Sequence, residues 1–134
     1  MVKTIDPAQR ELVKGLLVGW GKTEAEAEKL LEGSDVKANE NGDVIELRLY
    51  KNQLTGEIPE SIGQLSNLRE LFLSYNQLTG EIPASIGQLS NLTELYLCNN
   101  HLTGEIPAWI GQLSNLTELY LDENKLTGEI PASI

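Results

Sequence analysis

Apolar residues recur at a fixed spacing through the C-terminal two-thirds of the chain. Residues 68–91 read LRELFLSYNQLTGEIPASIGQLSN, residues 92–115 repeat this pattern closely, and residues 44–67 repeat it more loosely. A fourth copy opens at residue 116 and stops at residue 134. Copies that recur every 24 residues predict a solenoid, because each unit can bury its apolar face only against its neighbours.

Each copy predicts a short strand, a bend and a return to the core. Leu71 and Leu73 lie two residues apart, which predicts a strand with both leucines pointing inward. Asn76 ends the strand, and an inward asparagine must hydrogen-bond to backbone groups at the bend. Gly80 permits a further bend, and Pro83 turns the chain outward because it cannot donate a ladder hydrogen bond. One asparagine per coil predicts a ladder of Asn52, Asn76, Asn100 and Asn124.

The first 43 residues predict two helices. Asp6 is the expected N-cap of a helix over residues 6–20, Pro7 fits its first turn, and Gln9 is expected to complete a capping box. Thr23 and Glu26 form a second capping-box pattern, and that helix is expected to end near residue 32. The apolar face of the first helix comprises Leu12, Val13, Leu16, Leu17 and Trp20.

An edge strand is expected between these helices and the first repeat. Gly33 stops the second helix, and residues 36–38 can form a strand. Asn41 and Gly42 form a hairpin turn signal, so this strand should pair antiparallel with the strand that follows Val44. We therefore expect residues 1–43 to be a helical N-terminal cap that covers the first core surface of repeats 44–67, 68–91, 92–115 and a shorter 116–134.

The repeat pattern L-x-x-L-x-L-x-x-N-x-L-T-G-x-I-P-x-x-I-G-x-L resembles the leucine-rich repeat in its plant-specific class. The segment Leu78-Thr79-Gly80-x-Ile82-Pro83 is the signature of that class. The resemblance implies an α/β solenoid with a concave parallel sheet, a second short strand near the Thr-Gly pair and a 3₁₀ turn on the convex side. It also implies a recognition module, since such domains are often ectodomains of receptor kinases or receptor-like proteins.

The N-terminal cap of that class normally carries a cysteine pair, which this chain lacks. Cys98 is the only cysteine, so no internal disulfide can form. The opening MVKTIDPAQR has no apolar signal core. These features favour a cytoplasmic protein, while secretion with a trimmed signal stays open. The glycosylation sequons at Asn91 and Asn115 follow from the repeat consensus and decide little.

Outward-facing residues of the repeats superpose into columns on the concave sheet. All four tyrosines and the one phenylalanine of the chain fall in these columns, while the repeat core is aliphatic. Exposed aromatic residues on a rigid sheet are typical of binding hot spots, although stacked rings can also simply stabilise a sheet face. The candidate partner-binding residues are Glu46, Glu70, Glu94 and Glu118 in one column, Arg48, Phe72, Tyr96 and Tyr120 in the next, and Tyr50 and Tyr75 beyond them.

The glutamate column has three interpretations. Stacked like charges repel one another, so the column could attract a basic partner or weakly hold a cation. It could also be a solvated consensus position that only aids solubility. A second glutamate column, for which solubility is the favoured interpretation, comprises Glu57, Glu81, Glu105 and Glu129. Trp109 stands where other copies have serine, and we interpret it as neutral variation, an inserted fluorophore or a partner contact on the convex side.

Net charge and isolated residues narrow the function classes. The formal charge of −10 disfavours nucleic acids and anionic membranes as partners, and no apolar run is long enough for a membrane span. His101 has no nucleophile at a diagnostic spacing, so we expect no catalytic residues. We also expect no metal site and no cofactor, because the repeats contain no cluster of ligating residues.

The sequence therefore predicts a non-enzymatic protein- or peptide-binding module that uses its concave face. Its partner would carry basic and apolar groups. The alternative is a consensus or designed scaffold without a ligand, favoured by the near-identity of the second and third copies. Because no polar unit follows the fourth copy, we also expect homodimers through an uncapped C-terminal end that comprises Leu119, Leu121, Leu126 and Ile130.

Overall fold

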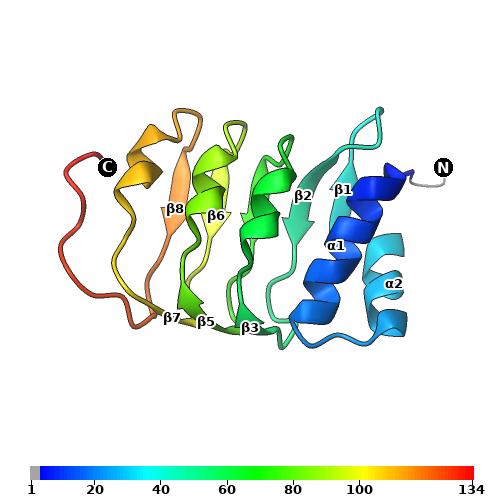
Figure 1. Ribbon diagram of the computed structural model, residues 1–134, viewed down its shortest axis with the longest axis horizontal. Helices are drawn as coiled ribbons and strands as arrows, with labels where there is room; N and C mark the ends of the chain where they lie inside the picture. The colour runs from blue at the N-terminus through cyan, green and yellow to red at the C-terminus, as the bar shows by residue number, and fades with distance from the viewer. Residues whose placement is uncertain (1–3) are drawn as a thin grey trace.

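The coils of the chain stack along one long axis, with two helices at the N-terminal end (Figure 1). This computed structural model describes residues 4–134. Residues 1–3 lie outside the described part. They belong to the expected N-terminal cap and to the opening segment in which no signal core is expected. The solenoid predicted from the 24-residue period is confirmed.

One face of the solenoid is a five-stranded sheet in the order β1-β2-β4-β6-β8. β1 pairs antiparallel with β2, as the hairpin signal predicts, and the remaining pairs are parallel. The parallel strands occupy equivalent positions in successive repeats. Equivalent residues of neighbouring repeats are therefore paired directly, without a shift in register. The strands are β1 (Val36–Ala38), β2 (Val44–Arg48), β4 (Glu70–Phe72), β6 (Glu94–Tyr96) and β8 (Glu118–Tyr120).

A second parallel sheet, in the order β3-β5-β7, follows each bend. It comprises β3 (Thr55–Glu57), β5 (Gln77–Glu81) and β7 (His101–Thr103). Each of three coils then turns through a proline into a 3₁₀ helix on the convex side, because proline ends ladder pairing. These helices are η1 (Glu60–Gln64), η2 (Ala84–Gln88) and η3 (Ala108–Gln112). Both features implied by the family resemblance are confirmed.

The two helices are α1 (Pro7–Gly19) and α2 (Glu24–Glu32). The Thr23–Glu26 capping box of α2 is confirmed. Asp6 caps α1 as expected, but the capping box predicted with Gln9 is wrong. The Asp6 N–H donates to the carbonyl of Gly42 at 2.8 Å, so Gln9 instead donates to Asp43 at 2.9 Å and accepts from the Val44 N–H at 2.6 Å.

The helices close the first coil of the solenoid. Val13 and Leu17 of α1, its C-cap residue Trp20 and Leu31 of α2 are almost fully buried in one core that continues through the repeat leucines. The Trp20 indole N–H donates to the carbonyl of Glu57 at 2.9 Å, which ties the helices to β3. Burial of each such side chain contributes about 1.5–3 kcal/mol. Burial decreases toward the fourth coil, where the partly buried side chains are those of Leu116, Leu119, Leu121 and Leu126.

The expected asparagine ladder joins successive coils. The Asn76 side chain accepts from the N–H groups of Asn52 and Leu54 at 3.0 Å. It donates to the carbonyls of Leu49 and Leu73 at 3.0 and 2.9 Å. Asn100 and Asn124 bond in the same manner to the coil that precedes each of them. Asn52 differs, because no repeat coil precedes it. Within residues 4–134 its amide donates only to the carbonyl of Tyr50 in its own coil.

Candidate partner-binding face

The sheet register brings the predicted columns together on the concave face. Glu46, Glu70, Glu94 and Glu118 are direct partners across neighbouring strands. The second column pairs Arg48 with Phe72, Tyr96 and Tyr120 in the same way. Neighbouring strands lie about 4.8 Å apart, so each column forms a continuous row of side chains.

The three rings of the second column form a stack. The centroids of Phe72 and Tyr96 are 4.2 Å apart with the planes inclined by 5°. Those of Tyr96 and Tyr120 are 4.5 Å apart and inclined by 21°. We refer to Phe72, Tyr96 and Tyr120 as the aromatic stack. Stacked aromatic pairs contribute about 0.5–1.5 kcal/mol beyond burial, so the stack stiffens the sheet and presents an apolar strip.

Arg48 ends the aromatic stack and neutralises part of the glutamate column. Its guanidinium lies over the Phe72 ring, 5.7 Å from the centroid. It pairs with Glu46 at 2.9 Å and with Glu70 at 3.2 Å, and Lys37 adds a second cation 3.7 Å from Glu46. Desolvation alone would lower the pKa of Arg48, but the attraction of the column carboxylates outweighs it and raises the pKa.

The other half of the glutamate column is held by a tyrosine. The Tyr96 hydroxyl bonds to Glu94 at 2.9 Å and closely to Glu118. Its hydrogen bond to Glu118 is the largest cause of the raised pKa of Tyr96. The hydrogen bond between the two carboxyl groups raises the pKa of Glu94, while donation from Tyr96 lowers the pKa of Glu118. Within residues 4–134 no lysine or arginine pairs with either carboxylate.

A groove of about 390 Å³ runs beside the aromatic stack. Tyr50 and Tyr75 form its exposed rim, with 53% and 52% of their surfaces accessible. Tyr75 has a left-handed backbone with φ of 60°, and the Lys51 ammonium lies 5.3 Å from its ring centroid. The lining is Tyr50, Phe72, Ser74, Tyr75, Tyr96, Cys98 and Tyr120. Thus five of the ten predicted site residues line a single apolar groove. A sixth, Arg48, lies over the Phe72 ring, and the four glutamates form the neighbouring column.

Two groove residues were not among the predicted site residues. Ser74 and Cys98 share the column of Tyr50, and the Cys98 thiol donates to the Ser74 hydroxyl at 3.1 Å. Ser74 lies in the lining of the groove but is only 5% exposed, because larger side chains around the groove cover it. Membership of the Tyr50 column was the sequence signal that could have identified both residues.

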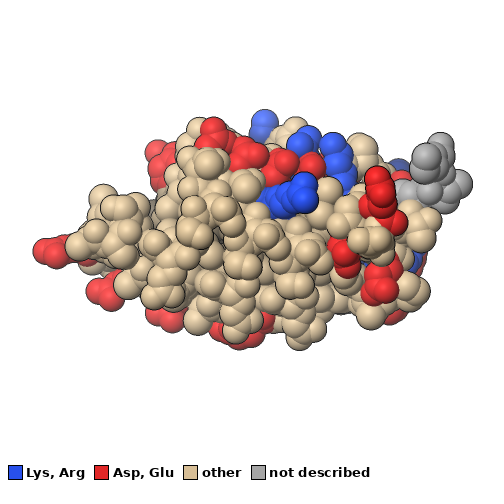
Figure 2. All heavy atoms as spheres, turned by 90° about the horizontal axis from the view of Figure 1, so that it is seen from above, with Lys and Arg blue, Asp and Glu red and all other residues tan. Residues whose placement is uncertain are grey.

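Charge is distributed unevenly along the molecule. Figure 2 shows basic side chains gathered along one long edge toward the N-terminal end, whereas acidic side chains occur along both long edges. On the concave sheet this asymmetry arises because Lys37 and Arg48 both belong to the first strands. The C-terminal half of the glutamate column is consequently the half that lacks a cation. Among residues 4–134, neither α-helix has the length and apolar character that a membrane span requires.

The repeats match known families and solved structures. Residues 43–65 and 67–89 match the family described as "Leucine Rich Repeat", and residues 90–132 match "Leucine Rich repeats (2 copies)". A comparison with curated proteins gives no match. The plant peptide hormone receptor RGFR1, solved with RGF2, is 42% identical with a TM-score of 0.67. That match covers 75% of this chain but only 19% of the receptor chain.

Two further solved structures match nearly the whole chain. A chain of the BIR3–SERK2 complex from Arabidopsis thaliana is 33% identical with a TM-score of 0.77, and the match covers 96% of this chain and 74% of that chain. The ectodomain of the receptor kinase SOBIR1 from Arabidopsis thaliana is 30% identical with a TM-score of 0.81, covering 96% and 73%. The chain therefore belongs to the leucine-rich repeat family, in its plant-type form.

Proposed function

We propose that this chain is a non-enzymatic module that binds a protein or peptide along its concave face. The observation that carries the proposal is the apolar groove beside a half-neutralised glutamate column. RGFR1 and RGF2 form a complex of a related receptor with a peptide hormone, which supports a peptide-sized partner. The proposal assigns no catalytic step and no cofactor to the chain.

Arg48 indicates the chemistry that the partner would use. Its guanidinium covers one ring of the aromatic stack and pairs with two column carboxylates. The same combination, without a cation of its own, recurs at Tyr96, Tyr120, Glu94 and Glu118. A partner arginine can contact an aromatic ring and a carboxylate together, which makes arginine a better match than lysine. Apolar partner side chains would fill the groove.

The experiment is a selection from a random peptide library against the wild-type protein. We expect enriched peptides to combine arginine with apolar residues. The variant Phe72→Ala/Tyr96→Ala/Tyr120→Ala should bind them at least about tenfold more weakly, because hot-spot aromatic residues contribute more than 1 kcal/mol each. Glu129→Gln is the control, because it removes one acidic charge outside this face. Selected peptides that bind the triple variant undiminished would place the site elsewhere.

A scaffold that associates with itself is the second candidate function. Its supporting observation is the exposure of Ile130 and Ile134, at 73% and 56% of their surfaces. Nearby, Leu113, Leu116 and Leu119 line a hollow of about 290 Å³. This candidate predicts association through the fourth coil and no enrichment of library peptides. The selection therefore discriminates it from the concave-face proposal.

A further inference from the structure

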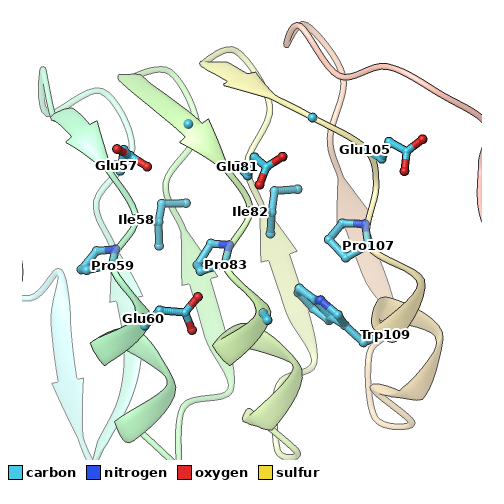
Figure 3. Close-up of a pocket in the computed structure, with 13 residues that line it drawn as sticks. Glu57, Ile58, Pro59, Glu60, Glu81, Ile82, Pro83, Glu105, Pro107 and Trp109 are labelled. Carbon is cyan, nitrogen blue, oxygen red and sulfur yellow. The ribbon is translucent and has the colours of Figure 1, made fainter.

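The convex side contains a larger groove than the concave face. Its volume is about 1030 Å³, and it lies where β3, β5 and β7 lead into the 3₁₀ helices (Figure 3). Three coils contribute the same residues to it, each a glutamate on the rim and a proline two positions later. These residues are Glu57, Glu81, Glu105, Pro59, Pro83 and Pro107. The repeat thus builds a periodic groove with carboxylates along one side.

Glycine makes room for each carboxylate. A Cβ at Gly80 would lie 2.5 Å from the Glu57 carboxylate, and one at Gly104 would lie 2.7 Å from that of Glu81. Both glycines have positive φ, at 77° and 82°. Among the described residues, neither Glu57, Glu81 nor Glu105 has a cationic partner, and no lysine or arginine lines the groove. The charge of the groove therefore complements a basic partner.

Trp109 forms the wall at the end of the groove (Figure 3). Its indole packs over Gly87, where a Cβ would lie 3.1 Å from the ring. The Trp20 indole N–H is bonded to Glu57, whereas that of Trp109 has no acceptor within residues 4–134. Trp109 consequently offers an apolar ring and a free hydrogen-bond donor on the same side chain.

The spacing of the carboxylates selects a backbone conformation. Strands in a sheet lie about 4.8 Å apart, so Glu57 and Glu105 are separated by about 10 Å. A polyproline II helix advances about 9.3 Å per turn of three residues, which nearly matches this distance. Side chains on one face of a β-strand repeat about every 6.6 Å, which does not match the distance between Glu57 and Glu105. Polyproline II backbone also leaves its carbonyls free for a donor such as the Trp109 indole.

We propose that the convex groove binds a proline-rich segment of a partner protein in the polyproline II conformation. Arginine or lysine at every third position would pair with Glu57 and Glu105. The intervening prolines would pack on Pro59 and Pro83, and the Trp109 N–H would donate to a backbone carbonyl. This site is separate from the concave face, so either can exist without the other.

The test uses the synthetic peptide Arg-Pro-Pro-Arg-Pro-Pro-Arg, labelled with fluorescein for anisotropy. We expect the wild-type protein to bind it, and unlabelled peptide to change the tryptophan emission. That change reports on Trp109, because Trp20 is only 1% exposed. Trp109→Ser should weaken binding about tenfold or more. Serine stands at the equivalent positions of Ser61, Ser85 and Ser133, so this substitution is compatible with the fold.

Matched controls separate conformation, charge and location. Glu105→Gln should weaken binding severalfold and reduce its salt dependence, whereas Glu129→Gln, outside the groove, should not. The peptide Arg-Gly-Gly-Arg-Gly-Gly-Arg keeps the charges without the preformed helix, so it should bind more weakly. Equal binding of the glycine peptide, full binding by Trp109→Ser, or no wild-type binding at millimolar peptide would each overturn the proposal. Loss of binding in the Phe72/Tyr96/Tyr120 triple variant would move the peptide to the concave face.

Discussion

At the scale of single residues, the asparagine ladder and the Glu94–Tyr96–Glu118 cluster carry the sharpest consequences. Asn76 is 8% exposed and hydrogen-bonds to backbone groups of two coils. Leaving such buried groups unpaired costs about 1–3 kcal/mol. In the cluster, the Tyr96 hydroxyl bonds to two carboxyl groups whose pKa values are shifted in opposite directions, so the contribution of the cluster to stability depends on pH.

Asn76→Ala should lower the free energy of unfolding by about 1–3 kcal/mol, because backbone groups at the bend lose their partners. Asn124→Ala should cost less, since its bonds lie in a partly exposed coil and water can replace them. Urea denaturation of the two variants checks this. Equal losses at the two positions would contradict the ladder argument.

The Glu94 carboxyl should make the protein less stable as pH rises. Its pKa is raised above the ordinary 4.5, so its contribution is fully present below 4.5 and is lost as pH rises through the raised value. Glu118 has a lowered pKa. Its contribution to stability is therefore present above pH 4.5 and is lost as pH falls through the lowered value. Glu94→Gln mimics the protonated form. The melting temperature of the variant, relative to that of the wild-type protein, should therefore increase as pH rises.

A titration of the carboxyl carbons by NMR provides the direct check. Glu94 should titrate above 4.5 and Glu118 below it. Tyr96→Phe should move the Glu118 midpoint upward, because it removes the main hydrogen bond that lowers that pKa. Midpoints that coincide in wild type would contradict the assignment.

At the scale of elements, glycine weakens helix α1 but is required in the bend that precedes the proline of each repeat. Gly15 lies in α1, and a Cβ there would meet no atom within 4 Å. Gly80 has a φ of 77°, which residues with a Cβ resist, and a Cβ would meet the Glu57 side chain. The same substitution therefore tests helix propensity in one element and coil geometry in the other.

Gly15→Ala should stabilise the protein by about 0.5–1 kcal/mol, because alanine loses less conformational entropy in a helix. Gly80→Ala should destabilise it by about 1–2 kcal/mol, because the left-handed conformation is strained for alanine. Chemical denaturation of the pair, each against wild type, measures both signs. A stabilising Gly80→Ala would show that the bend does not require positive φ.

At the scale of the whole molecule, coverage of the core is unequal at the two ends. Helices α1 and α2 close the N-terminal coil, whereas Leu119, Leu121 and Leu126 in the fourth coil are only partly buried. Apolar side chains left wet forfeit up to about 1.5–3 kcal/mol each. Covering them by a second copy is favourable, and two-fold pairing closes the assembly.

We therefore expect this protein to dimerise through its C-terminal end at high concentration. Leu126→Glu should shift the equilibrium to monomers, because a charge would be desolvated in the interface. Sedimentation equilibrium across a concentration series measures this, with the folded state checked by circular dichroism. A wild-type monomer at millimolar concentration would contradict this expectation. If its fourth coil is also protected from hydrogen exchange, the exposed leucines neither drive dimerisation nor open the last coil.

The sequence by itself determined the solenoid, because a 24-residue period with inward leucines admits few other ways to bury its apolar face. It also determined the columns of the concave face, since in-phase repeats must align in register. Tertiary structure alone decided where side-chain hydrogen bonds go. Gln9 bonds to the β1–β2 hairpin because that hairpin lies beside the start of α1, which no local pattern encodes.

Tertiary structure also decided which charges are neutralised and where the surface is hollow. Arg48 pairs with Glu70, 22 residues away, and thereby divides a uniform glutamate column into two unlike halves. The convex groove arises because Glu57 lies over Gly80 of the next coil and Trp109 packs over Gly87 of the preceding one. Each of these contacts joins different coils, so it depends on the stacking geometry rather than on the composition of one repeat.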